Sequence, residues 1–177
     1  MVGRALIAGE KRDTAYTLHE GVVAAGFQFA SGLAVGRVGE GSPFGAGTLA
    51  LQHPHFRARG FDLTEAVPGL FWGTINVALD RALRLGRADL TLEQVDWTAG
   101  AAPAARIAPE TFSFVRCCLA YDGHYHPGWI YYPHPETKPG TNAHRFDRLE
   151  VLAAPVAGLA YGEAVAVLCR ADAFVAG

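Results

Sequence analysis

The sequence predicts a mainly β protein, either a compact β-barrel or a sandwich, with a few short helices. Two observations lead to this prediction. The chain contains 21 glycines and 10 prolines among 177 residues, a frequency that favours many short segments joined by turns over a helical bundle. Short runs of alternating apolar residues also recur along the chain, and little of it has the periodicity of an amphipathic helix.

Composition excludes several classes of protein. Half of the residues are apolar and 18% are charged, so the chain can bury a core and is not disordered throughout. The formal net charge of −2 does not suit a nucleic-acid binder that works by basic charge. Three cysteines without a CxxC spacing predict buried thiols rather than a disulfide framework or a thiolate zinc site.

The chain is expected to form one β domain over residues 21–177, preceded by an arm or weak helix over residues 1–20. The apolar run at the start is too short for a signal peptide. The longest stretch without charges, residues 21–36, is shorter than a membrane span. These features predict a soluble, cytoplasmic protein that does not enter a membrane.

The first strands are expected in a glycine-rich region, residues 21–47, where apolar side chains alternate between turns. Thr48–Leu51 is predicted as another strand, residues 53–59 as a loop, and Leu63–Val67 as a helical turn.

Further strands are predicted by alternation and by β-branched residues. They are expected at Phe71–Leu79, Leu83–Leu85, Leu90–Trp97, Thr111–Tyr121, His124–Tyr132, Leu149–Leu152 and Ala164–Cys169. Asp122-Gly123 is a hairpin turn signal between two of them. The alanine- and proline-rich stretch 99–109 is expected to be a surface loop.

Histidines are one set of candidates for chemistry. Pairs with i, i+2 spacing, which share one face of a strand and suit zinc or iron, occur at His53/His55 and His124/His126. His134 and His144 follow the second pair. No acidic residue stands at a matching spacing for a third ligand, so ordinary loop histidines are the favoured interpretation and a histidine-metal enzyme is the alternative.

Two other segments could hold a phosphorylated ligand. The glycine-rich stretch 36–47 could offer backbone amides to phosphates, although it has neither a Walker nor a dinucleotide pattern, and a flexible loop is the alternative. Thr74 and Asn76 place a hydroxyl and a carboxamide on one strand face. Such oxygen ligands suit a Mg²⁺ that bridges to phosphates, while a solvent-facing polar pair is the alternative.

Three blocks of sequence occur in an order that resembles a known enzyme family. They are Ser31-Gly32-Leu33 followed by Gly39-Glu40-Gly41, then Phe71–Asp80 (FWGTINVALD), and finally Gly128–Pro133 with Arg148–Pro155 and Gly162–Val165. In order and spacing, residues 26–168 resemble the archaeal CTP-dependent riboflavin kinases, which phosphorylate riboflavin to FMN. The Gly-Thr-x-Asn strand is the most specific part of the likeness.

The resemblance implies a small closed β-barrel of the cradle-loop type, Mg²⁺ as cofactor, CTP or another nucleoside triphosphate as donor, and riboflavin or a related hydroxyl compound as acceptor. It implies the following residue roles: Thr74 and Asn76 hold Mg²⁺, Gly39, Glu40 and Gly41 line the nucleotide phosphates, Glu150 meets the acceptor hydroxyls as base or orienting group, and Thr137, in the loop after Pro133, also meets the hydroxyls of the flavin substrate. Phosphoryl transfer of this kind relies mainly on positioning and charge neutralisation.

A second hypothesis is a non-catalytic module that binds a flavin or nucleotide on the same barrel. The segment Val156–Tyr161 motivates it, because this segment is short and uncharged, whereas the family carries an arginine that helps to bind the nucleotide there. Residues 34–38, which interrupt the nucleotide loop, are another departure from the family pattern.

Overall fold

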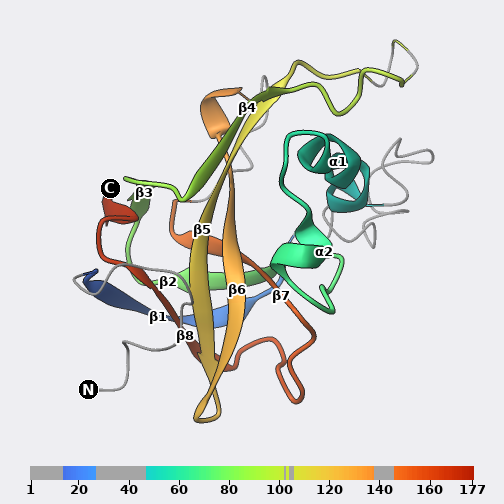
Figure 1. Ribbon diagram of the computed structural model, residues 1–177. Coiled ribbons are helices and arrows are strands. Elements are labelled where there is room, and N and C mark those ends of the chain that lie inside the picture. The colour runs from blue at the N-terminus through green and yellow to red at the C-terminus, as the bar shows by residue number, and fades with distance from the viewer. Residues whose placement is uncertain (1–13, 27–46, 102, 104–105, 138–145) are drawn as a thin grey trace.

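The predicted fold class is confirmed: the protein is mainly β and contains a closed antiparallel barrel of 6 strands with few short helices (Figure 1). The computed structural model describes residues 14–26, 47–101, 103, 106–137 and 146–177. Within these residues, no helix has both the length and the apolar character needed to cross a membrane.

Strands make up most of the regular structure. In chain order they are β1 (Tyr16–Ala24), β2 (Ile75–Leu79), β3 (Leu83–Leu85), β4 (Leu90–Val95), β5 (Glu110–Tyr121), β6 (His124–Pro133), β7 (Arg148–Ala153), β8 (Ala164–Arg170) and β9 (Phe174–Ala176). The helices are α1 (Thr48–Arg57), α2 (Leu63–Ala66) and the 3-10 helix η2 (Pro135–Thr137).

Strand β5 closes the barrel. The main sheet has the order β4-β5-β6-β7-β2-β1-β8, and β8 also pairs with β5. The first part of β5 pairs with β4 and the later part, Cys117–Ala120, pairs with β8. One long strand therefore changes neighbours along its length, and β4 extends the sheet beyond the closed barrel. Strands β3 and β9 form a separate pair.

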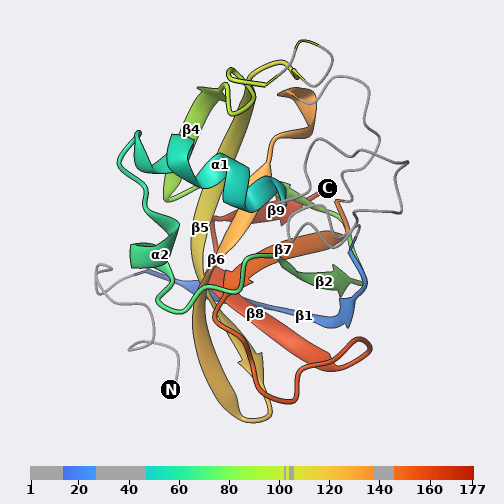
Figure 2. The ribbon, with the colours of Figure 1, turned by 90° about the vertical axis from the view of Figure 1, so that its right-hand side faces the viewer.

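The strands bury apolar side chains on both faces of the sheet. Val115, Cys117 and Leu119 of β5 belong to the cluster inside the barrel. Phe112 and Phe114, at the alternate positions, belong to a second cluster outside it, which also contains apolar residues of α1 and α2. Figures 1 and 2 show both helices on one side of the barrel. We call these the inner core and the outer core.

Most predicted strands after residue 70 are confirmed, with boundaries shifted at their ends. Strand β2 begins only at Ile75, four residues after the predicted start at Phe71. Strand β9 was not predicted. The turn Asp122-Gly123 is confirmed, since φ is 47° at Asp122 and 73° at Gly123, as a type I′ hairpin turn requires. The predicted helical turn at residues 63–67 is confirmed as α2.

Three predictions near the amino terminus are wrong in whole or in part. Residues 48–51 are the start of helix α1, not a strand, and most of the expected loop 53–59 is the rest of that helix. The helix forms despite Pro54 because Leu49, Gln52 and Phe56 lie on one face and are buried, and this burial outweighs local propensity. Residues 16–20 belong to strand β1, so this part of the predicted arm or weak helix is a strand, and residues 1–13 lie outside the described residues.

The three cysteines are buried and form no disulfide, as the sequence predicts. Cys117 lies opposite Cys169 in neighbouring strands, and both belong to the inner core. Burial raises the pKa of the Cys117 thiol, and the nearby Cys169 raises it further. Burial likewise raises the pKa of Cys169 to about 12.

We expect the protein to lose stability as pH rises above about 9, the pKa of an exposed thiol. The unfolded chain releases these thiol protons at that pH while the folded chain retains them, so the free energy of unfolding falls by about 1.4 kcal/mol per pH unit for each such group. Denaturant unfolding under reducing conditions between pH 7.5 and 10.5 measures the slope. Cys169→Ala should flatten it, and Tyr125→Phe, a change at an exposed residue, should not; equal slopes in all three proteins would contradict the prediction.

Candidate functional site

A row of polar side chains crosses three neighbouring strands on the outside of the barrel. Asn76 of β2 lies directly opposite Glu150 of β7, and Glu150 lies opposite Tyr131 of β6. Residues opposite one another in adjacent strands share a face of the sheet. Their sequence neighbours Val77 and Val151 belong to the inner core, so the row of Asn76, Glu150 and Tyr131 faces outward.

Thr74 joins this row at its β2 end. The Asn76 Nδ2 group donates to the backbone oxygen of Thr74 at 3.2 Å and to its Oγ1 at 3.3 Å. Both residues, like Glu150, are half-buried. The hydroxyl and the carboxamide therefore lie side by side, as the spacing of two residues predicts, and Glu150 lies one strand away.

Helix α1 is attached to the other end of the row. The Tyr131 hydroxyl donates to Gln52 Oε1 at 2.9 Å, and both side chains are buried. Burial raises the pKa of Tyr131 well above its usual range, and the negative charges of Glu150 and Glu110 raise it further. Tyr131 therefore stays protonated and acts as a hydrogen-bond donor, which fixes α1 against the strand next to Glu150.

Arg148 places a positive charge on the same face as Glu150, two residues before it on β7. One of its terminal nitrogens donates to the backbone oxygen of Ala25 at 2.9 Å. Its Nε atom is buried and has no hydrogen-bond partner among the described residues. In the sequence Arg148 stands out only as part of a motif, because nothing in a single sequence shows that β7 lies near the residues after β1.

Gly26 lies against the Asn76 carboxamide. A Cβ atom at Gly26 would lie 2.5 Å from Asn76 Nδ2, a distance that would force the carboxamide to move. Gly26 is also the last described residue before the stretch 27–46, and Gly47, the next described residue, is the N-cap of α1. The two residues that flank the glycine-rich segment 27–46, Gly26 and Gly47, are thus next to elements that contact the row.

The structure brings together three of the residues singled out in the sequence: Thr74, Asn76 and Glu150. Gly39, Glu40 and Gly41 lie outside the described residues. Thr137 is elsewhere. Its hydroxyl accepts from the Thr111 backbone nitrogen at 3.0 Å and donates to the His134 oxygen at 2.9 Å, so it joins η2 to the start of β5.

Among the described residues, neither histidine pair belongs to a group that could hold a metal ion. Within the described part of the chain, no group of three or more His, Cys, Asp and Glu side chains is arranged to hold a metal ion; His144 lies outside it. His53 and His55 are on helix α1, where a spacing of two residues does not place them on one face. His53 instead contacts Asp62 at 3.1 Å, and His124 Nδ1 is 2.7 Å from the Asp122 oxygen.

His134 takes part in a hydrogen-bond chain that the sequence did not reveal. Its Nδ1 is 2.7 Å from Glu136 Oε1 and its Nε2 is 2.8 Å from Ser113 Oγ. This is the connectivity of a catalytic triad. Ser113 is fully buried, however, and its hydroxyl also bonds to Thr91 Oγ1 at 2.7 Å. A nucleophile must reach its substrate, so we interpret the chain as a link between β4, β5 and the end of β6.

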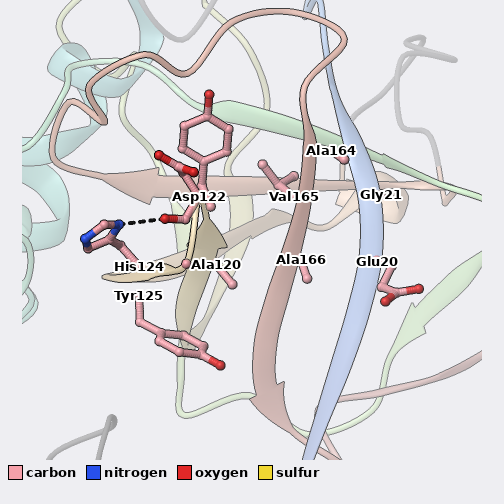
Figure 3. Close-up of a pocket in the computed structure, with 11 residues that line it drawn as sticks. Glu20, Gly21, Ala120, Asp122, His124, Tyr125, Ala164, Val165 and Ala166 are labelled. Atoms are coloured by element: carbon pink, nitrogen blue, oxygen red, sulfur yellow. Dashed lines mark hydrogen bonds between the residues drawn. The ribbon is translucent and has the colours of Figure 1, made fainter.

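A pocket of about 450 Å³ lies at the β5–β6 hairpin end of the barrel, away from the polar row (Figure 3). Its lining comes from β1, β5, β6 and β8: Glu20, Gly21, Ala120, Tyr121, Asp122, Gly123, His124, Tyr125, Ala164, Val165 and Ala166. Thr74, Asn76, Glu150 and Thr137 do not line it, so this pocket is separate from the residues to which the motif resemblance assigns ligands.

No protein-family model matches this chain, and no curated protein is significantly similar to it. Its function is therefore inferred from the geometry of the site together with the motif resemblance.

Proposed function

We propose that the protein is a phosphotransferase similar to the archaeal riboflavin kinases, which transfers a phosphoryl group from a nucleoside triphosphate to a hydroxyl of riboflavin or a related compound. The observation that carries the proposal is the grouping of Thr74, Asn76 and Glu150 on one face of a closed barrel. The resemblance assigned these three residues to one reaction centre, and they come from two separate parts of the chain.

Thr74 and Asn76 are suited to hold a Mg²⁺ ion. They supply a hydroxyl and a carboxamide oxygen, and Mg²⁺ prefers oxygen ligands while keeping several waters and substrate phosphates. Both side chains are half-buried, and the Asn76 carboxamide contacts the Thr74 hydroxyl through its Nδ2 atom at 3.3 Å. Rotation of the carboxamide by half a turn would put its oxygen beside the hydroxyl oxygen, and the two could then bind one ion. When bound, Mg²⁺ neutralises charge on the transferred phosphoryl group.

Glu150 would orient the acceptor hydroxyl and take its proton. The acceptor oxygen forms a bond to the γ-phosphorus, the bond from that phosphorus to the β-phosphate oxygen breaks, and the nucleoside diphosphate leaves. The hydroxyl proton passes to the Glu150 carboxylate. Asn76 lies directly opposite Glu150, so the groups proposed for donor and acceptor are on neighbouring strands and could hold the two substrates together.

Arg148 and the glycine-rich segment would hold the nucleotide phosphates. The Arg148 guanidinium donates a hydrogen bond to the backbone oxygen of Ala25, two residues before the glycine-rich segment 27–46 begins. The planar guanidinium of arginine suits the geometry of a phosphate group. Gly39, Glu40 and Gly41 are proposed to line these phosphates through the amides of that segment.

The test is an assay of the purified protein with Mg²⁺, riboflavin and each of the four common nucleoside triphosphates. Chromatography should detect FMN and the matching diphosphate, and addition of EDTA should stop the reaction. If no donor gives FMN under conditions in which a known riboflavin kinase works, the proposal fails. Binding of riboflavin or FMN without turnover would select the alternative, a binding module on the same barrel.

Gly26→Ala should impair the transfer reaction with little change in stability. The added methyl group would displace the Asn76 carboxamide, which lies 2.5 Å from the Cβ position, and misplacing a reactive group by about 1 Å costs about 100-fold in rate. The measurement is kcat at saturating substrates, with thermal unfolding as a check on the fold. Gly100→Ala is the matched control, because a Cβ there meets nothing within 4 Å. Unchanged kcat in Gly26→Ala would show that the carboxamide position does not matter.

A further inference from the structure

Two adjacent aromatic side chains are exposed beside the polar row. Phe71 is 41% exposed and Trp72 is 39% exposed. They precede Thr74 by two to three residues, between the buried residues Leu70 and Gly73. Large aromatic side chains left exposed next to polar groups are typical of binding surfaces.

The backbone around this pair is fixed by several contacts. The Phe71 nitrogen donates to the Ala153 oxygen at the end of β7 at 3.0 Å, and the Gly73 nitrogen donates to the Phe71 oxygen at 2.7 Å. The Trp72 ring lies 5.3 Å from the His53 ring of α1, tilted by 52°. His53 is in turn held by Asp62. The Trp72 side chain is therefore exposed to solvent, while the contact with His53 of α1 holds its ring in place.

These aromatic residues lie on one particular side of the row. The cross-strand order runs from Ala24 of β1 through Asn76 and Glu150 to Tyr131. The Trp72 ring contacts α1, the helix that is hydrogen-bonded to Tyr131. Along β7 the order is Arg148, then Glu150, then Ala153, to which the Phe71 backbone is hydrogen-bonded. Glu150 therefore lies between Arg148, which is proposed to bind the phosphates, and the aromatic pair.

We propose that Trp72, together with Phe71, stacks on the planar ring of the phosphoryl acceptor. This inference rests on the proposed function and adds the residues that bind the planar, flavin-like ring of its acceptor. The acceptor's ring covers the exposed side chains of Trp72 and Phe71, and the acceptor's hydroxylated chain extends toward Glu150. A nucleobase stacked on the same rings would have to extend its triphosphate past the negatively charged Glu150 to reach Arg148.

The experiment measures the affinity for riboflavin without nucleotide, by quenching of flavin fluorescence, and separately the KM for the nucleotide. Trp72→Ala should weaken riboflavin binding by roughly 10- to 100-fold, the range expected for loss of one stacked ring, and Trp72→Phe should retain part of the affinity. The KM for the nucleotide should stay within about twofold in both variants, well below the effect of a lost stacking partner. Tyr161→Ala, which removes a 65% exposed aromatic residue from another loop, is the control.

The outcomes separate the inference from the function on which it rests. If the wild type makes FMN and Trp72→Ala binds riboflavin normally, the stacking role is wrong and the activity stands. If the nucleotide KM rises instead, the ring that stacks is the nucleobase and the inference is overturned. If riboflavin binds through Trp72 but is never phosphorylated, the proposed function fails and the ring site stands. A wild type that binds no flavin contradicts both.

Discussion

Replacing Phe56 by alanine is expected to lower the free energy of unfolding by about 3–5 kcal/mol, the usual cost of deleting a buried phenylalanine ring. Phe56 is fully buried, and its ring contacts Phe112 at 5.0 Å and Phe114 at 5.4 Å between centroids. These rings lie in the outer core between α1 and strand β5. The cavity left by the ring would be enclosed by rigid strands that cannot move inward to fill it.

Urea unfolding at neutral pH measures this change. Phe71→Ala is the matched control, because the same ring is removed from a position that is 41% exposed, where a substitution costs about 0.5 kcal/mol or less. If Phe56→Ala and Phe71→Ala were equally stable, the outer core would not contribute as described.

The Phe56 substitution should also disturb the candidate site. Helix α1 carries Gln52, which bonds to Tyr131, and His53, which contacts Trp72. A helix that detaches from β5 loses both contacts. Phe56→Ala should therefore weaken flavin binding at temperatures where the barrel remains folded, and a wild-type affinity in that variant would show that α1 does not position the aromatic pair.

The barrel strands could be predicted from the sequence where alternation coincides with burial. In β5 and β6, turn signals and apolar alternation mark the limits of both strands. In β1 the pattern is misleading, because Leu18 and Val22 are 45% exposed while His19, at the alternate position, is buried. An apolar residue facing out and a polar one facing in cancel the signal, so the sequence of residues 16–20 indicates an arm where the structure has a strand.

The candidate site could be predicted only where it is local. The contact between Thr74 and Asn76 follows from their spacing of two residues. The position of Glu150 opposite Asn76 depends on the register of β2 against β7, which the packing of the whole barrel sets. The bond between Gln52 and Tyr131 could not be foreseen, because the sequence predicts the junction of a strand and a loop at Gln52.

Asn76→Ala is expected to reduce the rate of phosphoryl transfer by about 100-fold or more, as the loss of a group that stabilises developing charge does. The variant removes one of the two oxygen donors proposed for Mg²⁺ and the group directly opposite Glu150. Asn76 is half-buried and its Nδ2 bonds locally, to Thr74, so we expect the fold to persist.

Thr74 supplies the complementary test. Thr74→Ser keeps a hydroxyl beside the carboxamide and should retain most activity, whereas Thr74→Val removes it and should resemble Asn76→Ala. The two slow variants, Asn76→Ala and Thr74→Val, should need at least about tenfold more Mg²⁺ for half-maximal rate, because each loses a ligand to the ion. Thr137→Ala is the control: its hydroxyl bonds to Thr111 and His134, so its loss should lower stability without changing the Mg²⁺ requirement. Equal Mg²⁺ dependence in all four variants would mean that Thr74 and Asn76 do not hold the ion, and the reaction centre would have to lie elsewhere on the barrel.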